Sequence, residues 1–423
     1  MNNVAAAVAG LIGARWLAQV WLEQLNVRHA GAHATELPAE LEATTDPATR
    51  ARAIAYTRAH GRFNQLRDTC DALLLLAVLF TGLLPWAWAQ WTGRFGGSPR
   101  STTLFLLGVG VVLALPELPL AWFEQFRIEQ RFGFNTSTQR TWWLDRLKGG
   151  LLALALGYVL LRLVLTLMAW GGSGWWLWAW AGLVGMQLLL SLLAPVLIPP
   201  LFNRFTPLPA GPLRDRLLAL ARRTEFRVGD IVVMDGSRRS RHSNAFFTGL
   251  GRFRKIALFD TLVAGLGEDE LEAVLAHEIG HARLRHLAQR LVGMAAAALL
   301  GLYAVAWLGG QPWLPRAFGF EPGHPGPILL LFGLLAGVLT FWFTPLLRGW
   351  SRRHEHQADA FAARTLGDAQ PLVRALRRLN AQNLANLTPH PVYSRFYYSH
   401  PTPLERERAL QHFQSGKAGE QSR

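Results

Sequence analysis

Long apolar runs separated by short basic segments dominate the chain. A membrane-spanning helix needs about 20 mostly apolar residues, and seven stretches of the sequence come close to or exceed this length. The first stretch is partly polar, because it contains Arg15 and Glu23, whereas most of the others are nearly free of charge. The pattern predicts a mainly α-helical, polytopic membrane protein with about seven transmembrane helices, at residues 4–25, 72–91, 102–122, 149–170, 175–198, 291–314 and 326–347.

Composition supports a membrane protein and excludes other classes. Hydrophobic residues make up 51% of the 423 residues and charged residues only 17%, against about 25% charged in an average globular protein. This much apolar surface excludes general disorder. The single cysteine, Cys70, excludes an intrachain disulfide scaffold and a cysteine-based zinc cluster.

The basic excess follows the loops. There are 43 Lys and Arg against 28 Asp and Glu, a net charge of +15, and these cations alternate between rich and poor loops as the positive-inside rule requires. We therefore expect an external N-terminus, a cytoplasmic active site and no nucleic-acid partner. The expected division is a five-span region (1–199), a cytoplasmic catalytic insert (200–290), two further spans (291–347) and a cytoplasmic C-terminal part (348–423).

The insert carries the strongest chemical signal in the sequence. His277, Glu278 and His281 form the pattern H-E-x-x-H, which on a helix places both imidazoles on one face, one turn apart. Two neutral imidazoles so placed can bind Zn²⁺, and Glu278 beside them can take a proton from water. Around this motif the pattern predicts helices at 213–223 and 268–285 and a small sheet with a hairpin from strands at 231–234, 244–247 and 256–259.

A catalytic zinc ion needs a third protein ligand. The segment after the last span, 351–359, supplies Glu355 as our choice, with Asp359 one turn further on to accept the second N–H of a ligand histidine. His354 and His356 compete by chemistry alone but are more typical of surface or supporting histidines. His286 lies five residues beyond His281, on a different helix face, and is not expected at the site.

At these residues the chain resembles a known family, the integral-membrane zinc metallopeptidases typified by CAAX prenyl protease 1. The resemblance extends beyond the zinc motif to segments in family order over residues 120–410. The matching segments are 128–135, 200–208, 235–237, 242–249, 258–262, 351–359, and 398–401 with Arg406.

The resemblance implies a seven-span enclosure around an internal chamber, with a gluzincin-like zinc metallopeptidase domain at its cytoplasmic side. It implies one zinc ion per chain and proteolysis near the C-terminus of prenylated peptides. It makes His277, His281 and Glu355 the ligands and Glu278 the general base. The remaining roles it implies are an oxyanion donor (His400), supporting residues (Asp359 and Arg406) and a substrate-pairing strand (Asn244 and Ala245).

Two other functions fit the sequence less well. A quality-control protease for misfolded membrane proteins would keep the chemistry and change the substrate. A transporter or channel is allowed by seven spans and by intramembrane Glu117 and Arg162, but it would not need H-E-x-x-H. The Ala-, Arg- and Leu-rich chain without sorting signals is typical of bacteria, so we expect a multi-pass protein of the bacterial inner membrane that meets peptide or protein substrates, prenylated or membrane-associated, at the lipid bilayer.

Overall fold

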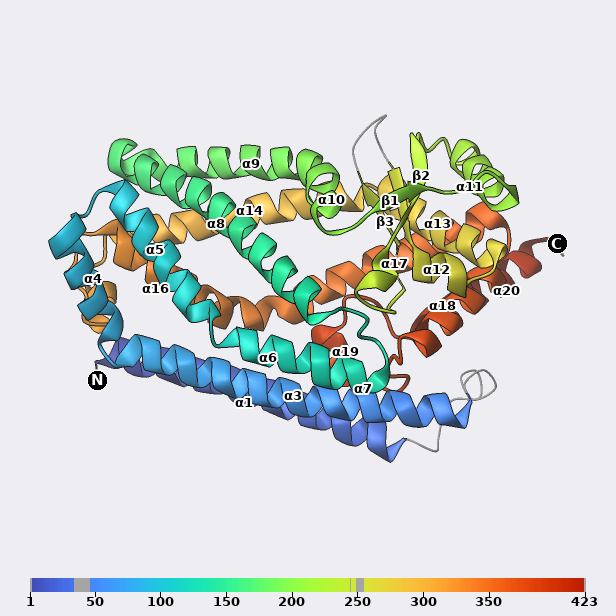
Figure 1. Ribbon diagram of the computed structural model, residues 1–423, viewed down its shortest axis with the longest axis horizontal. Coiled ribbons are helices and arrows are strands. Elements are labelled where there is room, and N and C mark those ends of the chain that lie inside the picture. Colours follow the sequence, from blue (N-terminus) through green and yellow to red (C-terminus); the bar gives the residue numbers. More distant parts are fainter. Residues whose placement is uncertain (1, 34–45, 244, 249–254, 422–423) are drawn as a thin grey trace.

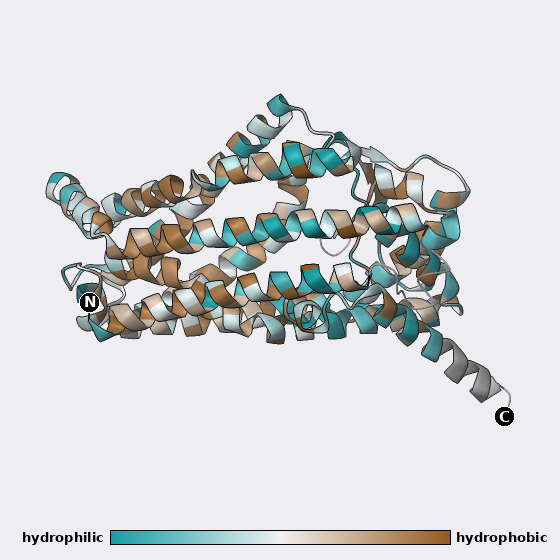
Figure 2. Ribbon diagram, turned by 90° about the horizontal axis from the view of Figure 1, so that it is seen from below, coloured by the Kyte–Doolittle hydropathy of each residue, from teal (hydrophilic) through white to brown (hydrophobic). Residues whose placement is uncertain are grey.

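Long helices run side by side along the molecule (Figure 1). A smaller unit of helices and strands, called the mixed unit, lies at one end and is formed by residues 205–283 and 344–421. The computed structural model describes residues 2–33, 46–243, 245–248 and 255–421. Hydrophobic positions gather in the half that contains the N-terminus, and hydrophilic positions gather around the mixed unit (Figure 2). The molecule is thus divided along its length by polarity, as a protein that is part lipid-embedded and part hydrated must be.

Each of the seven apolar runs lies in a helix suited to crossing a membrane. Six helices have sufficient length and hydropathy, and the bent pair α3 and α4 brings the number to seven within the described residues. The prediction of about seven spans is therefore confirmed. The six are α1 (Asn3–Ala32), Pro99–Phe132, α8 (Gln139–Trp170), Gly172–Phe202, α14 with bounds His286–Gly309, and Pro325–Leu366.

The span expected over residues 72–91 is bent. Helix α3 (Pro47–Phe80) ends there and α4 (Leu83–Phe95) leaves at an angle of 54°. Gly82 adopts φ +76°, a left-handed conformation that glycine reaches without a Cβ penalty, and it directly precedes α4. A run of apolar residues reports burial in lipid but not helix direction, so the bend is absent from the hydropathy pattern.

The remaining elements of the membrane half form, join or extend the spans. Arg67 of α3 bonds both Glu117, at 3.2 Å, and Glu124, at 2.6 Å, so Glu117 has a cationic partner on a neighbouring helix. The elements are α5 (Pro99–Ala114), α6 (Glu117–Phe123), the π-helix η1 (Glu124–Glu129), α7 (Gln130–Phe132), α9 (Trp175–Leu197), α10 (Pro199–Phe202), α15 (Trp313–Ala317) and α16 (Pro325–Thr340).

A four-stranded sheet with the order β1-β2-β4-β3 covers one side of the mixed unit. Strands β3 (Ala245–Thr248) and β4 (Lys255–Phe259) pair antiparallel, as the predicted hairpin requires, and β2 (Asp230–Met234) pairs parallel with β4. The sequence did not indicate β1 (Phe205–Pro207), which pairs antiparallel with β2. It has only three residues and ends in proline, so it lacks an alternating pattern.

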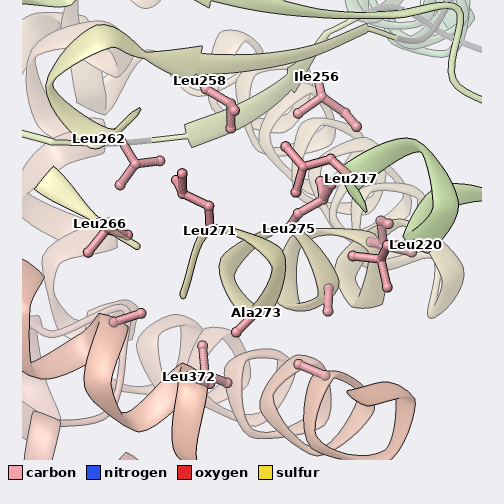
Figure 3. Packing of buried hydrophobic residues seen from close by; sticks show 14 of the residues in the cluster. Leu217, Leu220, Ile256, Leu258, Leu262, Leu266, Leu271, Ala273, Leu275 and Leu372 are labelled. Atoms are coloured by element: carbon pink, nitrogen blue, oxygen red, sulfur yellow. The ribbon is translucent and has the colours of Figure 1, made fainter. Parts of the chain in front are cut away.

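The helices of the unit come from two parts of the chain separated by two spans. One buried core joins them, and it contains Leu217, Leu258, Leu275, Leu372 and Leu410 (Figure 3). The insert and the C-terminal part are therefore one packed body. Its helices are α11 (Pro212–Arg223), α12 (Asp260–Gly265), α13 (Glu268–Arg283), α17 (Thr344–Leu366), α18 (Gln370–Gln382), α19 (Pro391–Tyr397) and α20 (Pro403–Gln421).

Candidate metal centre

Helix α13 is a rigid support for the histidine pair. It begins after Gly267, whose N–H donates to the Glu270 carboxylate at 2.8 Å, and its acidic first turn complements the positive end of the helix dipole. Leu271, Leu275 and Ile279 recur every four residues, and each is at most 2% exposed. This stripe, of which Figure 3 shows Leu271 and Leu275, anchors α13 in the core. The helical spacing places His277 and His281 together on another face.

Three ligand atoms from two helices meet at one point. The Nε2 atoms of His277 and His281 are 3.2 Å apart. Glu355 of α17 places Oε2 3.4 Å from the first of these atoms and Oε1 3.4 Å from the second. The sequence-selected group His277, His281 and Glu355 is thus brought together, and it is the one potential metal-binding group found in the described part of the chain.

This geometry fits a divalent cation. Ligand atoms about 2.0–2.1 Å from a tetrahedral zinc ion lie roughly 3.3–3.4 Å from one another. This is close to the 3.2 Å between the two nitrogens and to the 3.4 Å from each nitrogen to its own Glu355 oxygen. The Glu355 side chain is 2% exposed, and its Oε2 forms no hydrogen bond within the described residues. A buried carboxylate oxygen without a hydrogen bond is costly, and a cation between the three groups would remove that cost.

Close packing of two helices brings Glu355 to the histidines. A Cβ at Gly280 of α13 would lie 3.1 Å from the Ala358 Cα and 3.2 Å from the Ala358 carbonyl oxygen of α17. Ala358 and Ala362 are fully buried at this crossing. Small residues on both helices therefore allow the backbone approach that places a carboxylate opposite the imidazole pair.

His277 is held from behind by a carboxylate and a cation. Its Nδ1–H donates to Asp359 Oδ1 at 2.8 Å, and Arg406 of α20 donates to both Asp359 oxygens, at 2.8 and 2.5 Å. Burial alone would lower the pKa of His277, and the nearby carboxylates of Asp359 and Glu355 raise it to about 9. Arg406 thus holds the Asp359 carboxylate in place.

Glu278 and His400 both interact with the ligand group. Burial raises the pKa of Glu278 above its usual value, and the nearby Glu355 adds to the rise. His400, in the turn after α19, places Nε2 3.4 Å from Glu355 Oε2. Its Nδ1 lies 2.9 Å from the Ser399 hydroxyl, and its side chain is 60% exposed. The site thus combines a proton acceptor with a histidine on its open side.

Strand β3 lies at one end of the sheet and packs near helix α13. It is the last strand in the order and pairs only with β4 among the described strands, with Ala245 opposite Leu258. Ala245 packs against the core that also contains α13. Asn244, the other residue expected to bind substrate, lies outside the described residues.

His286 is outside the ligand group, but its ring contacts a ligand histidine. Its Nδ1 is 2.9 Å from His281 Nδ1, and its Nε2 is 2.9 Å from Gln357 Oε1. Arg285 adopts φ +57°, a left-handed conformation, so α13 ends at Arg283 and the chain turns His286 back toward His281. Helical spacing did not indicate this contact, because it depends on the left-handed turn at Arg285 and such a turn has no sequence signature in arginine.

The two competing histidines are not in the ligand group. His354 is 2% exposed and stacks on the His286 ring, with centroids 4.0 Å apart. His356 is exposed and lines a separate surface hollow of about 490 Å³ with Arg352, Arg353 and Arg408. Glu355 thus stands alone among the three neighbouring candidates in facing the histidine pair.

Comparison with known proteins gives the same relatives at every level. Residues 26–204 match the model "CAAX prenyl protease N-terminal, five membrane helices", and residues 207–414 match "Peptidase family M48". CAAX prenyl protease 1 homolog of Arabidopsis thaliana is 35% identical, covering 84% of this chain and 86% of the relative. CAAX prenyl protease 1 of Saccharomyces cerevisiae is 34% identical, covering 90% of each. The crystal structure of S. mikatae Ste24p matches with a TM-score of 0.90 and 31% identity, covering 97% of this chain and 99% of the other.

Proposed function

The chain belongs to peptidase family M48 with the membrane region of CAAX prenyl proteases, and from this premise we propose that it cleaves prenylated peptides near their C-terminus. It is a multi-pass membrane metalloendopeptidase of the CAAX protease type, acting on peptide or protein substrates in a lipid environment. The observation that carries the proposal is the convergence of His277, His281 and Glu355 at the end of a membrane-spanning bundle.

We propose one Zn²⁺ per chain, held by His277, His281 and Glu355. Two imidazoles and one carboxylate are a donor set that catalytic zinc sites use, and the 3.2–3.4 Å spacing of the donor atoms suits this ion. When bound, zinc supplies a Lewis acid that polarises a peptide carbonyl and makes water more acidic. Asp359 and Arg406 hold the His277 ring in the orientation that points Nε2 at the site.

Glu278 is the proposed general base. It removes a proton from the attacking water as the oxygen–carbon bond forms, and it returns that proton to the amine nitrogen as the peptide bond breaks. Burial raises the pKa of Glu278 toward the range useful for both steps.

His400 is the proposed donor to the oxyanion. If the Ser399 hydroxyl donates to His400 Nδ1, the Nε2 atom carries the hydrogen and is free to donate. One such donor is typically worth about 2.7–4 kcal/mol in the transition state. As the family resemblance implies, we propose that an extended substrate runs along β3 at Asn244 and Ala245, in the strand-addition mode of peptide binding.

The proposed setting is a bacterial inner membrane with the active site in the cytoplasm. The basic segments at 200–290 and 348–423 support this orientation. We also propose the division 1–199, 200–290, 291–347 and 348–423, in which the second and fourth segments form the catalytic unit, because both contribute to one core.

The test is Glu278→Gln assayed on prenylated and unprenylated peptides of the same sequence. We expect this variant to retain zinc at one per chain and to lose cleavage by at least about 10²-fold, the low end of what a positioned base contributes. Glu268→Gln, in the first turn of the same helix, is the matched control and should cleave normally.

Two results would contradict the proposal. Wild-type cleavage by purified Glu278→Gln would remove the base assignment. Equal turnover of prenylated and unprenylated peptides would favour a quality-control protease that acts on membrane proteins without regard to the lipid.

A further inference from the structure

The Nδ1 atoms of His277 and His281, the ring nitrogens that point away from the proposed metal, have different kinds of partner. His277 donates to the carboxylate of Asp359, whereas the Nδ1 of His281 faces a second imidazole, His286, at 2.9 Å. Metal-ligating histidines almost always donate their other ring N–H to an acceptor, which fixes the tautomer and the ring plane. The acceptor for His281 must therefore be sought at His286.

A single assignment of hydrogens satisfies the whole contact chain. Because His281 turns Nε2 toward the ligand group, its Nδ1 carries the hydrogen. His286 Nδ1 must then accept, so its Nε2 carries a hydrogen, and that atom lies 2.9 Å from the acceptor Gln357 Oε1. This row of hydrogen bonds ends at Gln357 on α17, two residues after Glu355. It therefore connects the helix that carries His277 and His281 with the helix that carries Glu355.

The surroundings of His286 fix its ring in this position. His286 is 1% exposed and lies flat on the His354 ring, with centroids 4.0 Å apart and an interplanar angle of 8°. His354 is in turn held by a contact of 3.0 Å between its Nε2 and Gln289 Oε1. Two buried, stacked rings leave His286 little freedom to rotate away from His281.

The backbone bears a strain that serves this placement. Arg285 lies at φ +57° and ψ +32°, a left-handed conformation that residues other than glycine rarely adopt. It separates α13 from α14 by two residues, so that the first residue of α14 reaches back to a side chain of α13. Strained non-glycine residues of this kind persist where the surrounding structure requires them, often at functional sites.

We propose that His286 is a positioning residue for the metal centre: with Gln357 as its own acceptor, it sets the tautomer and ring plane of His281. The inference rests on the proposed function only in that a divalent metal occupies the three-ligand site. His286 does not touch the metal or the substrate. Its effect is on how tightly the ligand histidine holds the ion.

The test is the affinity of the full-length protein for Zn²⁺, measured by competition with a chromogenic chelator. His286→Phe keeps a flat ring for stacking but removes the acceptor, so we expect affinity to fall about 10–100-fold, as for other partners of metal ligands. His286→Asn places its Oδ1 where Nδ1 was and should restore affinity to within a few-fold of wild type. Equal affinity of His286→Phe and wild type would overturn the proposal.

Two further variants separate hydrogen bonding from packing. His354→Phe keeps a flat ring against His286 and leaves the hydrogen bonds from His281 through His286 to Gln357 intact. We therefore expect it to lose much less Zn²⁺ affinity than His286→Phe, and an equal loss would show that packing alone matters. If His286→Phe does not fold, Gln357→Leu tests the same chain from its far end. We expect that variant to weaken zinc binding by a smaller factor, and unchanged affinity would count against the chain.

A spectroscopic readout adds an independent check. Co²⁺ in place of Zn²⁺ reports ligand geometry by visible absorption, and we expect the spectrum of His286→Phe to shift and that of His286→Asn to resemble wild type. The outcomes distinguish the two proposals. A wild-type protein that binds no metal would contradict the proposed function, whereas a wild type that binds metal only as tightly as His286→Phe does would contradict only this inference.

Discussion

Asp359 determines how strongly protons compete with metal at His277. Its hydrogen bond helps to raise the pKa of His277 to about 9, so this imidazole binds a proton at neutral pH that a metal ion must displace. We expect Zn²⁺ affinity to rise with pH, by up to about tenfold per unit below pH 9 if one proton is released. Chelator competition between pH 6 and 8 measures this slope.

The matched variant is Asp359→Asn, which keeps an acceptor oxygen but removes the charge. The pKa of His277 should fall toward its usual value of about 6.5, so the pH dependence above pH 7 should flatten. Loss of the charged partner should lower affinity by about 10–100-fold, and the weaker competition from protons should offset part of that loss, most strongly at low pH. A slope equal to that of wild type would show that Asp359 does not control the proton on His277.

Individual residues differ in how well the sequence predicts their place. His277 and His281 follow from helical spacing alone, and Glu355 follows from the need for a third ligand near the same membrane face. The contact of His286 with His281 could not be predicted, because the turn at Arg285 needs a left-handed backbone conformation that an arginine in the sequence does not indicate. Local periodicity thus predicts residues within an element but not those brought together by a break between elements.

At the scale of elements, the crossing of α13 and α17 sets the size of the metal site. Gly280→Ala would place a Cβ 3.1 Å from the Ala358 Cα, a backbone atom that cannot rotate away. The helices must separate by a few tenths of an ångström, which moves Glu355 from the imidazoles. We expect zinc affinity to fall about tenfold, since ligand positions are held within roughly 0.5 Å in working sites.

A glycine in open space provides the control for this substitution. A Cβ added at Gly185 of α9 would meet no neighbouring group of the described residues within 4 Å, so Gly185→Ala should leave zinc binding unchanged and stabilise its helix slightly. Both variants are compared by chelator competition and thermal melting in detergent. Equal zinc affinity of Gly280→Ala and Gly185→Ala would mean that the close approach does not govern the site.

A second inter-element contact joins the membrane half to the segment before β3. The Glu129 carboxylate of η1 accepts from Tyr56 at 2.7 Å and lies 2.9 Å from His60 Nε2 and 3.3 Å from His242 Nε2. Burial alone would lower the pKa of His242, and its bonds to Glu129 and Asn383 raise the pKa above its usual value. Protonated His242 therefore stabilises this junction.

The pH dependence of that junction has a definite sign. A raised folded-state pKa contributes stability that is fully present below the unfolded value, about 6.5, and is lost as pH rises through the folded value. Glu129→Gln should thus lower the melting temperature most below pH 6.5 and less at higher pH. Glu225→Gln, whose side chain is 82% exposed, is the control and should show little effect. A Glu129→Gln deficit that grows with pH would contradict the assignment.

On the scale of the whole molecule, the lengths of the apolar runs and the charges of the loops predict the membrane spans well. They do not predict the bends and contacts that connect the elements. Seven apolar runs correspond to the spans because lipid tolerates only helices whose backbone groups are satisfied internally. The bend at Gly82 and the short strand Phe205–Pro207 escape prediction, since neither changes the hydropathy of its surroundings. The common core of the insert and the C-terminal part also required the structure, because it depends on contacts across two spans.

Orientation across the membrane is the last property that the charge pattern predicts. The turn containing Gly97 lies at the end of the bundle opposite helix α11, which carries the exposed Arg222 (Figure 1). The chain has one cysteine, so Cys70→Ser provides a background for the single-cysteine variants Gly97→Cys and Arg222→Cys. If the basic segments face the cytoplasm, a membrane-impermeant maleimide should label Gly97→Cys in intact spheroplasts and Arg222→Cys only in inverted vesicles. The reverse labelling would place the metal centre on the outer face, where a prenylated substrate made in the cytoplasm would reach it only after crossing the bilayer.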